Sequence, residues 1–181
     1  MNESKKYISP LKLNLYLHII NKTNDGYHNL ESLMTFCDFG DLISIKKEKD
    51  FSFTIDGPFA KNLSKTENII LDAVKLLEEF AKFKINVHIK LTKNIPIASG
   101  MGGGSSNAAT VIHCLKDLFK ISIEKNTLDS LLFSLGADVP FCFFRKTAIV
   151  KGKGEKIEFL SSKIPELPVL LINPLIEIST R

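Results

Sequence analysis

The chain has 181 residues, of which 44% are hydrophobic and 24% are charged, and its net charge is +4. This length suits one large domain, or one domain with part of a second, and the composition excludes a disordered or fibrous protein. The mild basic charge favours anionic ligands but lacks the dense basic patch of a dedicated nucleic-acid binder, so we expect no nucleic-acid partner.

The cysteine spacing and the apolar runs indicate the cellular compartment and whether the protein binds a metal. Cys37, Cys114 and Cys142 are far apart and show no Cys-x-x-Cys spacing, so neither a disulfide framework nor a zinc site is expected. Residues 1–10 have no apolar run of the signal-sequence kind, and no 18 consecutive apolar residues occur. We therefore expect a cytoplasmic protein with no membrane partner and no protein-bound metal.

The first third of the chain is predicted to be mostly sheet. Apolar residues alternate from Leu11 to Ile19, which is the period of a strand with one buried face, and this places Lys12 and Asn14 on the other face. Residues 21–29 are rich in Asn, Asp and Gly and predict a turn or long loop. Further strands are expected near residues 42–45 and 51–55.

Helices and strands mix in the remainder. A helical stripe at 68–83, a strand at 85–91 and a second helix near 105–118 precede a third helix at 127–135, with Asn126 as N-cap and Gly136 just past its end. Strands are predicted at 141–144, in a hairpin around 152–154, and at 169–172. Because strands and helices do not alternate regularly, the fold class is α+β.

The most informative motif is SGMGGGSSN, from Ser99 to Asn107, between the predicted strand and the second helix. Glycines let backbone amides approach an anion, and the free N–H groups and the positive dipole end of the helix, which begins near Ser105, point at the same place. Ser105 and Ser106 add hydroxyl donors. The loop lacks the Lys-Ser or Lys-Thr of a Walker A loop, and the bland alternative is a glycine turn without a ligand.

With its preceding proline, the motif P…GMGGGSSNAA resembles the phosphate loop of the GHMP kinase superfamily, with Met101 where leucine is commoner. The resemblance implies an N-terminal domain in which a ribosomal-protein-like sheet and its helices form two layers, with ATP as cofactor and Mg²⁺ brought with the ATP. It assigns ATP binding to Pro96, Ile97, Ala98, Ser99, Gly100, Met101, Gly102, Gly103, Gly104, Ser105 and Ser106.

Four further motifs, KLNL, DGYH, GD and GADVPFCF, together with a late EISTR, resemble one branch of the superfamily. That branch phosphorylates the 2-hydroxyl of 4-diphosphocytidyl-2-C-methyl-D-erythritol in non-mevalonate isoprenoid precursor synthesis. The resemblance implies Asp138 as catalytic base and Lys12 as its partner. It also implies substrate contacts from Asn14, Tyr27 and His28. Without the resemblance, we would interpret Asp138 as a turn former, Lys12 as a solvated strand residue and His28 as a surface loop residue.

The resemblance also implies an organisation into domains. Residues 1–165 are expected to form the ATP-binding and catalytic domain, and 166–181 the start of a second domain that is largely missing, with an exposed apolar face where it would dock. Other readings are a GHMP kinase with a different substrate, which DGYH disfavours, an inactive remnant that still binds nucleotide, and an RNA-binding module of the same fold. The sequence does not indicate the oligomeric state.

Overall fold

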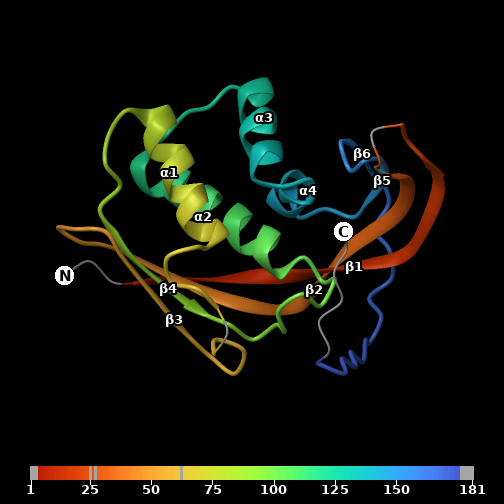
Figure 1. Ribbon diagram of the computed structural model, residues 1–181, viewed down its shortest axis with the longest axis horizontal. Helices are drawn as coiled ribbons and strands as arrows, with labels where there is room; N and C mark the ends of the chain where they lie inside the picture. Colours follow the sequence, from red (N-terminus) through yellow and green to blue (C-terminus); the bar gives the residue numbers. More distant parts are fainter. Residues whose placement is uncertain (1–3, 25, 27, 62, 176–181) are drawn as a thin grey trace.

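The computed structural model describes residues 4–24, 26, 28–61 and 63–175, which form one mixed sheet with helices packed on one face (Figure 1). The sheet order is β3-β4-β2-β5-β6, and β1 pairs with β2 on its other side. The strands are β1 (Lys5–Lys22), β2 (His28–Lys47), β3 (Ser52–Asp56), β4 (Val87–Thr92), β5 (Ala148–Gly152) and β6 (Lys156–Phe159). The helices are α1 (Ile69–Ala81), α2 (Gly103–Phe119), α3 (Lys125–Leu135) and α4 (Val139–Phe144).

Strand β2 organises the sheet because it is long enough to pair with three other strands. It is antiparallel to β1 from Lys5↔Ile45 to Lys22↔His28, with three register shifts along the way. On its other edge, its second half pairs with β4 and its first half with β5. Strands β3 and β4, the one parallel pair in the described part of the chain, are joined through α1, since parallel neighbours need a crossover connection.

The hydrophobic core lies between this sheet and α1 and α2. From the sheet come Ile43, Ile89 and Leu91, each at most 1% exposed, and from the helices come Ile70 and Leu115, both fully buried. The α+β expectation is confirmed. Among the described residues, no helix has the length and apolar character needed to cross a membrane.

Two predicted strands are wrong. Residues 141–144 form most of α4, because Pro140 near the helix start sets a helical φ and lets Phe141 stack on Phe36 of β2 with ring centroids 4.6 Å apart. Four apolar residues in a row suit a buried strand or a buried helix equally, so periodicity could not decide. Residues 169–172 form no strand either, and Leu170 is 85% exposed.

The buried face predicted for the first strand is also wrong beyond its start. Leu11 is fully buried, but Leu15 and Leu17 are about half exposed at 48% and 52%, and Ile19 is 67% exposed. Lys12, expected in solvent if it had no role, is 6% exposed. The alternation identified a strand, but only the packing of α2 on the first part of β1 decides which side chains are covered.

Exposed apolar side chains also gather on the segment that follows β6. Residues 164–169 and 171 line a groove of about 810 Å³ together with Leu13 and Leu15 of β1 and residues 35–39 of β2. In Figure 1 this C-terminal segment runs below the sheet, away from α1 and α3. The expected apolar face is therefore present, and its role in docking a further domain stays a prediction.

One helix start was predicted correctly and one was not. Asn68 caps α1, since its Oδ1 accepts a hydrogen bond from Ile70 N at 3.0 Å. Helix α3 instead begins at Lys125 after Glu124, which puts Asn126 inside the first turn. Helix α3 ends before Gly136, as expected.

These two asparagines form a matched pair for a stability test. Asn68→Ala removes the cap of α1 and should lower the free energy of unfolding by about 1 kcal/mol. Asn126→Ala should change it by less than about 0.5 kcal/mol, because no cap is lost. Urea denaturation followed by circular dichroism measures both, and equal losses in the two variants would contradict the assigned helix starts.

Candidate active site

The glycine loop connects β4 to α2 and ends in a left-handed turn. Gly100 and Gly102 have φ values of 73° and 63°, a conformation that side chains with a Cβ rarely adopt. Gly102 is the N-cap of α2, and no side chain among the described residues makes a capping hydrogen bond to this helix start. The amides of its first turn therefore remain available to an anion, and anion binding by this loop stays a prediction.

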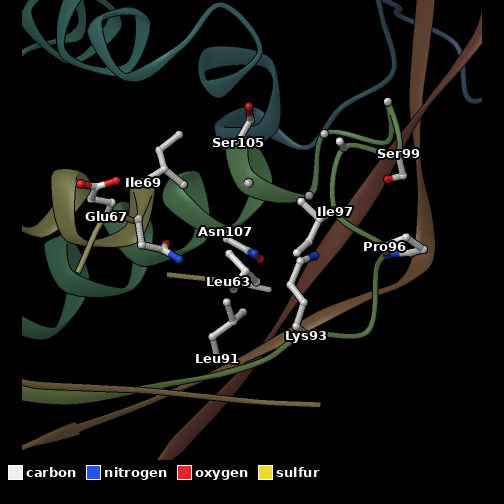
Figure 2. Close-up of a pocket in the computed structure, with 16 residues that line it drawn as sticks. Leu63, Glu67, Ile69, Leu91, Lys93, Pro96, Ile97, Ser99, Ser105 and Asn107 are labelled. Carbon is white, nitrogen blue, oxygen red and sulfur yellow. The ribbon is translucent and has the colours of Figure 1, made fainter. Parts of the chain in front are cut away.

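A pocket of about 400 Å³ lies in front of this helix start (Figure 2), a volume within the usual range for small-molecule sites. Nine of the eleven predicted ATP-binding residues line it; Met101 and Ser106 do not. The other lining residues were not predicted: Leu63, Glu67, Asn68, Ile69, Leu91, Lys93 and Asn107. They come from the segment before α1 and its first residue, from β4 and the residue after it, and from inside α2, and no local motif in the sequence connects these regions.

Lys12 and Asp138 meet beside the glycine turn, although 126 positions separate them in the sequence. Lys12 Nζ lies 3.0 Å from Asp138 Oδ2, with the lysine side chain 7% exposed and the aspartate 35% exposed. The backbone amide of Lys12 donates to Met101 O at 3.1 Å. A Cβ at Gly102 would lie 2.7 Å from Lys12 Cγ, so glycine is needed here for the lysine to fit. The pair thus combines a reachable carboxylate with a fixed ammonium.

Ser106 has a different position from the one that the sequence suggested. It is fully buried, its Oγ donates to Pro10 O at 2.6 Å, and it accepts from Ser9 Oγ at 3.0 Å. Further along α2, Thr110 donates to Ser106 O at 2.8 Å and accepts from Arg145 at 2.6 Å. The hydroxyl of Ser106 is therefore used to join α2 to β1, two residues before Lys12.

A buried ion pair that the sequence did not reveal lies on the other side of the helix start. Lys93 Nζ and Asp41 Oδ2 are 2.6 Å apart, and their side chains are 5% and 0% exposed. Burial lowers the pKa of Lys93, while the neighbouring Asp41 carboxylate acts in the opposite direction. Asp41 belongs to the short GD motif, whose two letters gave no indication of this contact.

The predicted substrate residues are not all brought to this site. Asn14 lies on β1 two residues after Lys12, and its Nδ2 donates to Ser32 Oγ at 2.7 Å. His28 is exposed and begins β2 opposite Lys22, at the tip of the β1–β2 hairpin on the side of β5 and β6 (Figure 1). Tyr27 lies outside the described residues. Neither Asn14 nor His28 lines the pocket in front of α2.

Metal-ligand clusters and reactive thiols add nothing to the site. Within the described part of the chain, no group of three or more His, Cys, Asp or Glu side chains could hold a metal ion. Burial raises the pKa of Cys114 and Cys142 to about 12, so neither thiol is ionised near neutral pH.

Comparison with known proteins gives consistent results. Residues 68–146 match the model of the GHMP kinases N terminal domain. A 4-diphosphocytidyl-2-C-methyl-D-erythritol kinase from Chelativorans sp. (strain BNC1) is 45% identical over 96% of this chain and 59% of the relative, and one from Rhizobium etli (strain CIAT 652) is 44% identical over 93% and 57%. The chain thus spans about three fifths of the length of these curated relatives.

Solved structures agree with this. A crystal structure of 4-(cytidine 5'-diphospho)-2C-methyl-D-erythritol kinase superposes with a TM-score of 0.73 at 30% identity, covering 89% of this chain and 61% of the other. Methanococcus jannaschii mevalonate kinase shares the fold, with a TM-score of 0.64 at 14% identity, covering 90% and 56%. The chain therefore belongs to the GHMP kinase family. Within it, the sequence groups with the 4-diphosphocytidyl-2-C-methyl-D-erythritol kinases.

The adjacent serines of the loop give a sharp test of this geometry. Ser106→Ala leaves the buried Pro10 carbonyl without its donor and should lower the free energy of unfolding by about 1–3 kcal/mol. Ser105→Ala, at the pocket surface, should change it by less than about 0.5 kcal/mol. Urea denaturation measures both, and a Ser106 variant as stable as the Ser105 variant would contradict the structural role of Ser106.

Proposed function

We propose that this chain carries the ATP-binding and phosphoryl-transfer part of a kinase that acts on the 2-hydroxyl of 4-diphosphocytidyl-2-C-methyl-D-erythritol. The observation that carries the proposal is the Lys12–Asp138 pair held at 3.0 Å directly beside the glycine turn. In the proposal, residues 1–165 are the catalytic domain, and residues from 166 onward belong to a second unit.

The nucleotide is assigned to the pocket in front of α2. Phosphate oxygens are negatively charged, and the pocket offers them the uncapped amides of α2, the Ser105 hydroxyl and the Lys93 ammonium. Leu63, Ile69 and Leu91 supply apolar surface for a base. Mg²⁺ brought with ATP would neutralise charge on the transferred phosphoryl group.

The chemistry requires one proton to leave the substrate hydroxyl as its oxygen bonds to the γ-phosphorus of ATP and the bond to the leaving ADP oxygen breaks. Asp138 is exposed enough to receive this proton on Oδ1 or Oδ2. The Lys12 ammonium beside it offsets the negative charge that develops on the attacking oxygen. Its buried stem and the hydrogen bond from its amide to Met101 hold it in place.

The choice of substrate rests on the relatives that are named for it and on the DGYH motif. Asn14, close to Lys12 on β1, is proposed to orient the substrate near the transferred phosphoryl group. Tyr27 and His28 are proposed to hold its cytosine end, because aromatic and imidazole groups stack on bases and hydrogen-bond with them. This assignment requires the substrate to extend from Lys12 toward the tip of the β1–β2 hairpin.

Asp138→Asn should lower the turnover number by roughly 10²- to 10⁴-fold, because the amide cannot accept the proton. Phosphorylation of 4-diphosphocytidyl-2-C-methyl-D-erythritol is measured with Mg²⁺ and ATP, together with the ATP dissociation constant from calorimetric titration. ATP affinity should change by less than about threefold, since Asp138 does not line the nucleotide pocket.

Asp117→Asn, which alters an exposed carboxylate at the far end of α2, is the matched control and should leave turnover unchanged. Equal turnover in the parent chain and the Asp138 variant would overturn the role of Asp138. ATP binding without turnover in the parent chain would favour a nucleotide-binding protein without kinase activity. Activity on another GHMP-kinase substrate alone would overturn the substrate assignment.

The glycine turn supplies a second test. Gly102→Ala places a Cβ against Lys12, whereas Gly100→Ala meets nothing within 4 Å although both residues have positive φ. Backbone strain is therefore similar in the two variants, and the steric clash differs. We expect at least tenfold weaker ATP binding for Gly102→Ala than for Gly100→Ala in calorimetric titration. Equal losses would show that the approach of Lys12 to the loop has no bearing on the nucleotide site.

A further inference from the structure

Asp41 is a fully buried carboxylate that accepts four hydrogen bonds, two of them from side chains that line the nucleotide pocket. Its Oδ1 accepts from Asn94 N at 2.7 Å and from Ile95 N at 2.8 Å. Its Oδ2 accepts from Lys93 Nζ at 2.6 Å and from Asn107 Nδ2 at 2.9 Å. One side chain from β2 thus ties together the exit of β4 and the second turn of α2.

Two of the groups that Asp41 holds line the pocket and keep unused hydrogen-bonding capacity. Asp41 is the one acceptor that the described residues provide for the Lys93 ammonium, which carries three N–H donors. Asn107 Oδ1 is buried and has no hydrogen-bond partner there, an arrangement that ordinarily needs one. Figure 2 shows Lys93 and Asn107 side by side in the pocket.

A fully buried ion pair adds little to the free energy of unfolding on its own. Removing two charges from water costs about as much as their attraction returns, and well-packed apolar residues of similar volume often stabilise a core as well or better. Folding stability therefore does not explain why Lys93 is buried in the pocket wall, and we look for the reason in what the pocket binds. A Cβ at Gly103 would lie 3.1 Å from Lys93 Nζ, so the ammonium is directly against the first residue of α2.

We infer that Asp41 is a positioning residue for the nucleotide: it holds the Lys93 ammonium at the pocket and fixes the side chain of Asn107 in the pocket wall. The inference rests on the proposed function, because the ligand is the ATP assigned to that pocket. Asp41 itself does not line the pocket and acts through these two side chains.

Loss of the Asp41 carboxylate should change how ATP binding depends on pH. Burial lowers the pKa of Lys93 and the Asp41 carboxylate opposes that change, so Asp41→Asn should lower the pKa of Lys93 further. Lys93 would then lose its charge at a lower pH in the variant, and with it attraction for phosphate. Of the ionisable residues near Lys93, Glu67 lines the same pocket and the Asp56 carbonyl accepts from Lys93 N. Lys12 and Asp138 lie beside the neighbouring Gly102.

The test is calorimetric titration of the 181-residue chain with ATP and Mg²⁺ from pH 7.5 to 10. At each pH the dissociation constant of Asp41→Asn is divided by that of the parent chain, so that titration of ATP itself cancels. This ratio should be at least ten and should rise with pH, because Lys93 loses its charge at a lower pH in the variant. Asp117→Asn, the same chemical change on an exposed side chain, should give a ratio near one throughout. A purely structural role for Asp41 would give a ratio that does not change with pH, which would overturn the inference.

A second variant covers the case in which Asp41→Asn does not fold. Asp41→Asn with Lys93→Met removes both charges, so no ion is left unpaired in the core, and the chain should fold with a melting temperature near that of the parent. We expect it still to bind ATP at least tenfold more weakly. Parent-like affinity in this folded double variant would overturn the inference, whereas failure of the parent chain to bind ATP would overturn the proposed function instead.

Discussion

The site depends on the close contact between the start of β1 and the glycine turn that opens α2. The Lys12 amide donates to Met101 O, and Ser106 Oγ donates to Pro10 O, so strand and helix are joined on both sides of the turn. Without this junction, Lys12 would sit on the edge of a sheet with solvent around it. With it, a lysine of the first strand becomes part of a site whose other residues come much later in the chain.

Two lysines flank the helix start, and each is held by one aspartate. Lys12 lies against Gly102 and pairs with Asp138, and Lys93 lies against Gly103 and pairs with Asp41. The glycines therefore serve two needs at once, because the missing side chains admit the lysines as well as leaving amides free for an anion. The two pairs differ in exposure: Asp138 is open to a reactant, and Asp41 is sealed in the core.

The parts of the site that could be predicted are those carried by contiguous sequence. The glycine-serine loop predicted an anion site at a helix start, and nine of the eleven residues assigned to ATP binding line the pocket there. Anion binding itself stays a prediction. Ser105 and Ser106 could not be separated, because adjacent helical residues look alike in the sequence but point about 100° apart. Lys93, Asn107 and Asp41 were missed because their importance comes from contacts between β2, β4 and α2, which no local pattern encodes.

By itself, the sequence determined the α+β class, the approximate positions of α1 and α2, and the family resemblance. The fold class and the helix positions follow from periodicity and the resemblance from contiguous motifs, both of which involve a few neighbouring residues. Only the tertiary structure decided that residues 141–144 are helical, that β1 leaves Leu17 and Ile19 exposed, and that Lys93 is buried beside Asp41. The resemblance had implied the pairing of Lys12 with Asp138, and the structure adds the burial of Lys12. Burial and ion pairing depend on which elements pack together, and that information is shared among segments far apart in the chain.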